Sequence, residues 1–108
     1  NPPAAPTVLS AYWWGEGDAM FSYRTPANNG APITGYEWTW KDGDTWQPWR
    51  PVTDVPVEDP DAPNGIMTTD NGSWPASGYY GAKTMRVRAV SSEGAGPATP
   101  DVNAQYNW

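Results

Sequence analysis

Apolar and polar residues alternate along this chain with a period of two, and no segment shows a sustained period of 3.6 residues. The clearest case is "YEWTWK", in which Tyr36, Trp38 and Trp40 are separated by single polar residues. Because successive side chains of a strand point to opposite faces, this pattern predicts a β-strand with one strongly apolar face. We therefore expect Tyr36, Trp38 and Trp40 to lie in the core.

Similar alternations, bounded by clusters of Gly, Pro, Asn and Asp, predict further strands. "TMRVRAV" places Met85, Val87 and Ala89 on an apolar face and Arg86 and Arg88 on the opposite face. Seven strands are expected, at residues 7–12, 19–24, 36–41, 44–50, 65–69, 84–90 and 102–106. The fold class is therefore all-β, either a sandwich or a barrel.

The hairpin after Lys41 determines where the next two tryptophans point. Asp42-Gly43 is a strong signal for a two-residue turn, which pairs Lys41 with Asp44, Trp40 with Thr45, Thr39 with Trp46 and Tyr36 with Trp49. In that register Trp46 lies on the polar face and Trp49 in the core, whereas a three-residue loop reverses both. We prefer the first register because it places a lysine opposite an aspartate, and Pro48 then marks an edge strand.

Composition limits the possible functions. The 108 residues suffice for one domain, residues 1–108. The chain contains no cysteine and no histidine, which excludes disulfides, thiolate nucleophiles and the usual zinc sites, and we expect no cofactor. The net charge is -6, and the six basic residues are scattered, so neither nucleic acid nor insertion into a membrane is expected.

Proline and glycine divide the chain into further segments. "NPPAAP" at residues 1–6 is a proline-rich lead-in of the kind found in linkers, and residues 51–65 and 70–82 are expected to be long loops. A first residue other than Met suggests a piece excised from a longer protein. "AQYNW" suggests a strand running to the last residue, and hence a domain that closes its protein.

Three phrases, "PAAPT", "NNGAPITGYEW" and "MRVRAVSSEGAGPAT", together with the order of the strands, resemble a fibronectin type III domain over nearly the whole chain. The resemblance implies a seven-stranded, immunoglobulin-like sandwich of two antiparallel sheets. It places Tyr23 where the family usually has its core tryptophan. Lys83 stands where the family usually has the tyrosine of its tyrosine corner, so the corner is either missing or rebuilt from Tyr79 or Tyr80.

The implied sandwich gathers many aromatic residues at one pole, and these are candidates for stacking on sugar rings or anchoring a protein partner. With Trp46 on the polar face, the candidate ligand-binding or partner-binding residues are Trp13, Trp14, Trp46, Trp74, Tyr79 and Tyr80. The alternative is that each merely packs against its neighbours. That alternative is weaker for Trp13 and Trp14, because two adjacent residues of a strand cannot both point inward.

Acidic residues raise two other possibilities. Asp54, Glu58, Asp59 and Asp61 could bind calcium, but the spacing of an EF-hand is absent and prolines stiffen the segment, which favours a solvated loop. Pairs of carboxylates such as Asp42 and Asp44 are expected at turn tips rather than in a cleft. We therefore expect no catalytic activity.

We expect a structural or display module of a phage virion protein, in tail or capsid, or of a bacterial surface protein. Its location would be the virion surface, the cell surface or the extracellular space. This expectation rests on the resemblance, because relatives are often attached to such proteins. Its partners would be protein subunits of a larger assembly or cell-surface glycans. The alternatives are a carbohydrate-binding module that uses the exposed Trp and Tyr residues, and a passive spacer in a secreted enzyme.

Overall fold

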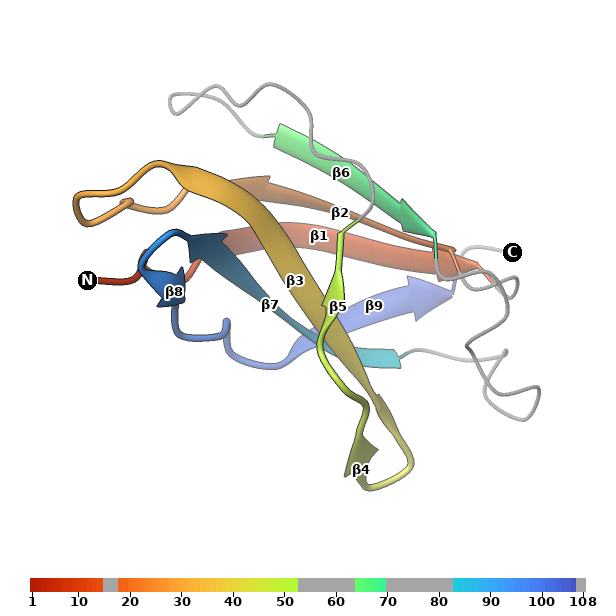
Figure 1. Ribbon diagram of the computed structural model, residues 1–108. Helices are drawn as coiled ribbons and strands as arrows, with labels where there is room; N and C mark the ends of the chain where they lie inside the picture. Colours follow the sequence, from red (N-terminus) through yellow and green to blue (C-terminus); the bar gives the residue numbers. More distant parts are fainter. Residues whose placement is uncertain (15–17, 53–63, 70–82, 107–108) are drawn as a thin grey trace.

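The computed structural model describes residues 1–14, 18–52, 64–69 and 83–106 (Figure 1). The described residues form strands and contain no helix, so the predicted all-β class is confirmed. The strands are β1 (Thr7–Trp14), β2 (Asp18–Arg24), β3 (Ile33–Asp42), β4 (Thr45–Trp46), β5 (Arg50–Pro51), β6 (Asn64–Thr69), β7 (Lys83–Ser91), β8 (Gly94–Ala95) and β9 (Val102–Tyr106).

Strands occur at all seven predicted places, with two differences. The strand expected at residues 44–50 is split into the short strands β4 and β5, and a further short strand, β8, follows β7. Hydrogen bonds connect the strands in the order β4-β3-β7-β9-β1-β2-β6, with β5 on β3 and β8 on β7. One layer contains β1, β2 and β6, and the other contains β3 and β7 with the short strands beside them (Figure 1). The two layers are joined through β9, which pairs antiparallel with β7 and parallel with β1.

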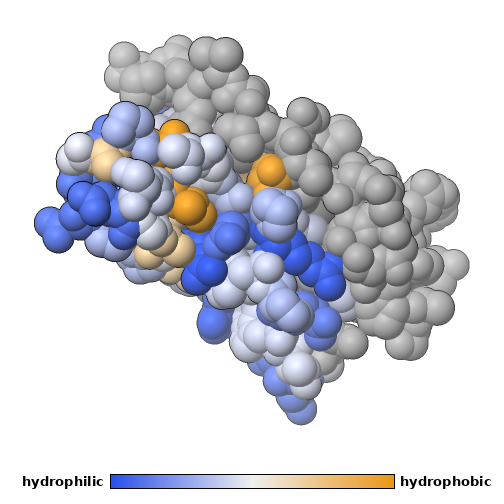
Figure 2. All heavy atoms as spheres, in the orientation of Figure 1, coloured by the Kyte–Doolittle hydropathy of each residue, from blue (hydrophilic) through white to orange (hydrophobic). Residues whose placement is uncertain are grey.

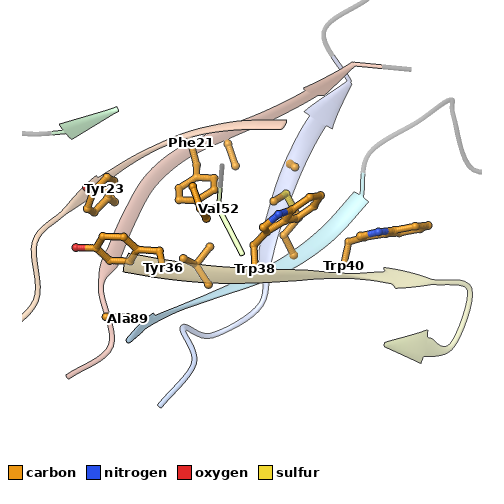
Figure 3. Close-up of a cluster of buried hydrophobic side chains, with 11 residues drawn as sticks. Phe21, Tyr23, Tyr36, Trp38, Trp40, Val52 and Ala89 are labelled. Atoms are coloured by element: carbon orange, nitrogen blue, oxygen red, sulfur yellow. The ribbon is translucent and has the colours of Figure 1, made fainter. Parts of the chain in front are cut away.

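The core lies between β2 of one layer and β3 and β7 of the other (Figure 3). The Tyr23 and Tyr36 rings meet across it with centroids 4.9 Å apart and planes inclined at 63°, an edge-to-face contact. Trp40 and Tyr23 are completely buried. Of the expected core residues, those buried are Tyr23, Tyr36, Trp38, Trp40, Met85, Val87 and Ala89.

The register of the β3–β4 hairpin differs from the predicted one by two positions. Asp42 pairs with Thr45 and Lys41 with Trp46, so the turn is Gly43-Asp44. Gly43 has φ of +60°, the value required at the first position of a type II′ turn, where glycine is the preferred residue. This turn needs no positive φ at Asp42. Because the shift is two residues, Trp46 keeps its predicted place on the polar face.

The expectation for Trp49 is wrong. Pairing stops after Trp46 and resumes with Trp38 opposite Arg50 and Glu37 opposite Pro51, which leaves one extra residue on the partner segment. This extra residue reverses the faces, so Trp49 points outward and is only half-buried. Val52 takes the expected place instead: its N–H donates to the Tyr36 carbonyl at 2.9 Å, and its side chain is buried.

The proline-rich lead-in packs against the domain and is not a free linker. Pro3 is among the largest fully buried side chains. The Ala4 N–H donates to the Ala27 carbonyl at 2.9 Å, and the Asn29 side-chain amide donates to the Pro2 carbonyl at the same distance. A Cβ on Gly96 would lie only 1.9 Å from the Pro3 carbonyl oxygen, so the two backbones touch.

Candidate functional site

The polar face of β3 and β7 carries an ordered set of aromatic and basic side chains. We call the surface formed by Trp46, Trp49, Arg86 and Arg88 the Trp–Arg face. On β7 the two arginines alternate with the buried Met85, Val87 and Ala89, so both point away from the core. The two tryptophans come from the segment that follows the hairpin, on the opposite side of β3.

Trp46 stacks with Arg86. The guanidinium carbon lies 4.1 Å from the centre of the indole, and the Lys41 ammonium is 5.8 Å from the same ring. Since β4 and β7 flank β3 on opposite sides, the stacked side chains must meet above β3. This explains why Thr39, on the outward side of β3, is only 3% exposed. The Thr39 hydroxyl donates to the Gln47 carbonyl beneath the stack.

Trp49 and Arg88 form a second stack of the same kind, two residues further along β7. The guanidinium carbon of Arg88 lies 4.1 Å from the centre of the Trp49 indole. Two nitrogens of the same guanidinium donate to one carboxylate oxygen of Glu37, at 2.7 and 2.8 Å. Arg88 is therefore bound both at its flat face and at its edge, which is possible because a guanidinium is planar and its donors lie in that plane.

Arg86 is held in the same way but is more exposed. Its Nε donates to an Asp101 carboxylate oxygen at 2.7 Å, and the two side chains are 39% and 53% exposed. Salt bridges this exposed contribute only about 0–1 kcal/mol, and an exposed cation–π pair about 0.5–1 kcal/mol. The stacks therefore order the side chains more than they stabilise the fold, and they leave polar and aromatic groups open to a partner.

The structure does not describe the side chains of the other predicted aromatic residues. Trp13 and Trp14 belong to β1, where their backbones pair with Ala19 and Asp18 of β2. Their side chains are not described, and Trp74, Tyr79 and Tyr80 lie outside the described residues. The predicted aromatic pole therefore stays a prediction. Trp46 belongs to a different group, with Arg86 as its neighbour.

Sequence reasoning missed the part played by Arg86, Arg88 and Trp49. Alternation had placed both arginines on the polar face of their strand, and Glu37 and Trp46 on the polar face of the hairpin, which was the available signal. The extra residue that turns Trp49 outward has no comparable local signature. The acidic residues 54, 58, 59 and 61 lie outside the described part of the chain. Elsewhere, no three acidic side chains of described residues come together as a metal site would require.

The described residues contain no helix long and apolar enough to cross a membrane. On the side shown in Figure 2, hydrophobic residues appear as isolated spots among hydrophilic ones. A contiguous apolar patch is the usual mark of a large hydrophobic interface. No such patch is visible among the described residues on this side (Figure 2).

Comparison with known proteins gives the fold. No protein-family model matches the chain, and no curated protein matches it by sequence. A solved myokine structure aligns over 97% of this chain and 99% of its own length, with 17% identity and a TM-score of 0.55. The twitchin kinase region from C. elegans, which includes Fn31 and Ig26 segments, aligns over 94% of this chain and 16% of its own length, with 13% identity and a TM-score of 0.55.

The fold is of the fibronectin type III and immunoglobulin-like kind. A human fibronectin type III domain also aligns, over the whole of this chain and 87% of its own length, with 20% identity, but its TM-score of 0.44 carries no argument. At these identities the likeness concerns the fold alone. A fold of this kind is compatible with many functions and does not by itself assign one.

Proposed function

We propose that this chain is a non-enzymatic display and interaction module on the surface of a larger assembly, either a phage virion protein of tail or capsid or a bacterial surface protein. Its contact with neighbouring protein subunits is made by the Trp–Arg face. The observation that carries the proposal is the pair of Trp–Arg stacks, 46 with 86 and 49 with 88.

The residue types of the Trp–Arg face suit a protein interface. Trp and Arg are the residues most often found to carry binding energy when they become buried at a contact. Here the two arginines are already held in place by Asp101 and Glu37, so they lose little side-chain entropy on binding. A partner that covered Arg86 and Trp46 would also exclude water and strengthen the cation–π attraction between them.

Location is the first test. An antibody raised against the 108-residue chain is used for immunogold electron microscopy of the source cells and of any phage particles they release. We expect gold on the particle surface or on the cell envelope. Gold confined to the cell interior and absent from assembled particles would contradict the proposal.

Carbohydrate binding is the second candidate, favoured by the half-buried indoles of Trp46 and Trp49. A sugar ring stacks on an open indole face, and a guanidinium occupies one face of each of these rings. We therefore expect iodide to quench part of the tryptophan fluorescence, and a panel of glycans to leave that quenching unchanged. Trp46→Phe and Trp49→Phe identify the share of the signal that belongs to this face.

Relief of quenching by a glycan would overturn this expectation. If the relief is lost in either Phe variant, the Trp–Arg face is the sugar site. If it persists in both, the sugar binds elsewhere, and Trp13, Trp14, Trp74, Tyr79 and Tyr80 become the residues to substitute. The spacer alternative predicts neither surface location nor any ligand.

A further inference from the structure

The two layers of the fold are joined over a very short distance. The parallel ladder between β1 and β9 consists of Tyr12 opposite Gln105 and Trp13 opposite Tyr106. From there the two strands diverge toward the start of β1 (Figure 1). Two adjoining hollows of about 280 and 370 Å³ lie along this divergence, and Val8 and Val102 line both. We call this stretch, from Pro6–Tyr12 to Thr99–Gln105, the β1–β9 seam.

Strand edges form both walls of the seam. The other edge of β1 is occupied by β2, and the other edge of β9 is occupied by β7. No described residue pair joins β1 to β9 between Val8 and Ala11. Backbone N–H and C=O groups on the two facing edges are therefore available to a new strand, as on any open sheet edge.

Apart from Asp101, the described side chains along the seam are uncharged and partly apolar. Val8 and Val102 are partly buried and pack against the core. Leu9 lies where the β1–β2 register shifts, between Val8 and Ser10, and it is 47% exposed. Among the described residues that line the two hollows, only Asp101 is charged, and Arg86 binds its carboxylate. The lining therefore suits a segment that has no charge and has apolar side chains at alternate positions.

We propose that the β1–β9 seam accepts an extended, uncharged segment of a partner protein as an additional β-strand. The backbone of that segment pairs with the open edges, and alternate apolar side chains contact Val8, Leu9 and Val102. Because Tyr12 already pairs with Gln105, the open β1 wall runs from Pro6 to Ala11. Six residues at about 3.3 Å each span about 20 Å, so a segment of about six residues fills it. The seam adjoins the Trp–Arg face at Asp101, whose carboxylate Arg86 binds, but the proposed strand pairing uses none of the four residues of that face.

The test uses the full 108-residue chain and a capped synthetic peptide of sequence TVTVTVT. Its matched control has the same sequence with every valine N-methylated, which removes the N–H donors along one edge. Amide hydrogen exchange and NMR shifts are followed residue by residue. We expect the first peptide to slow exchange and shift amide signals within 8–11 and 102–105, and the methylated peptide to bind at least about tenfold more weakly.

Two variants separate seam binding from general stickiness. Leu9→Asp puts a charge at the seam on a side chain that is already half exposed, and it should weaken the TVTVTVT peptide at least about tenfold. Ser92→Asp, at an exposed turn, should bind as the unchanged chain does. Retained circular dichroism and melting temperature show that Leu9→Asp is folded.

Three results would overturn the proposal. One is the absence of protection at the seam with the peptide in about hundredfold excess. Another is equal binding of the methylated peptide, because the contact would then not be strand pairing. The third is protection at the seam that rises with the concentration of the chain alone, because the occupant would then be a second copy of this chain.

Discussion

At the scale of single residues, Gly96 has the least room for a side chain among the glycines that the structure describes, because it lies against Pro3. An alanine Cβ at position 96 would lie 1.9 Å from the Pro3 carbonyl oxygen, which is backbone and cannot rotate away. We expect Gly96→Ala to lower the free energy of unfolding by about 2–3 kcal/mol, as overpacking does elsewhere. Denaturation by urea, followed by circular dichroism, measures it.

Gly35→Ala is the matched control, because nothing lies within 4 Å of the Cβ it would add. Its free energy of unfolding should stay within about 0.5 kcal/mol of the unchanged chain. In a chain that lacks residues 1–5, Gly96→Ala should change the free energy of unfolding much less than in the full chain. If both alanine variants are equally stable, the lead-in does not pack as described.

At the scale of elements, the two Trp–Arg stacks connect residues 46–49, which follow the hairpin, to β7. A double-mutant cycle with Trp49→Ala and Arg88→Ala measures the link between them. We expect a coupling of about 1 kcal/mol, because Arg88 is only 26% exposed and therefore less screened than an ordinary surface pair. Urea denaturation of the four proteins gives the value.

The control cycle pairs Trp49→Ala with Arg24→Ala, an exposed arginine on β2 in the other layer. Those two substitutions should be additive within about 0.3–0.5 kcal/mol. A coupling no larger for Arg88 than for Arg24 would show that the stack contributes nothing to holding the segment.

At the scale of the whole molecule, one core cluster draws on both layers, with Ala11, Phe21, Trp38, Val87 and Ala104 from five different strands. Such a cluster should unfold in a single cooperative step. Tryptophan fluorescence and far-ultraviolet circular dichroism should therefore give coincident transitions, with an unfolding enthalpy of about 75 kcal/mol near 60 °C for 108 residues. Two separate transitions would mean that the layers unfold independently.

The same experiment tests the acidic segment at residues 54–61. A solvated loop leaves the midpoint of unfolding unchanged when calcium replaces EDTA. A bound ion would raise the midpoint, since any ligand that binds only the folded state stabilises it. A rise would therefore contradict the expectation of a solvated loop.

The all-β class, the apolar face of Tyr36, Trp38 and Trp40, and the outward direction of Arg86 and Arg88 all followed from the sequence by itself. The reason is that side-chain direction along a strand alternates locally, so a few neighbouring residues suffice to define it. The direction of Trp46 also followed, although the turn was misplaced, because an error of two residues does not change the face.

Only the tertiary structure decided where Trp49 points, how residues 1–6 pack and where β1 and β9 separate. Each depends on contacts between segments far apart in the chain: one extra residue opposite β3, Pro3 against Gly96, and a parallel ladder of two residue pairs. The alternation of apolar and polar residues along a strand is the same whichever strand pairs with it, so it does not specify the partner. Pairing, bulges and packing are instead set by the free energy of the whole assembled core.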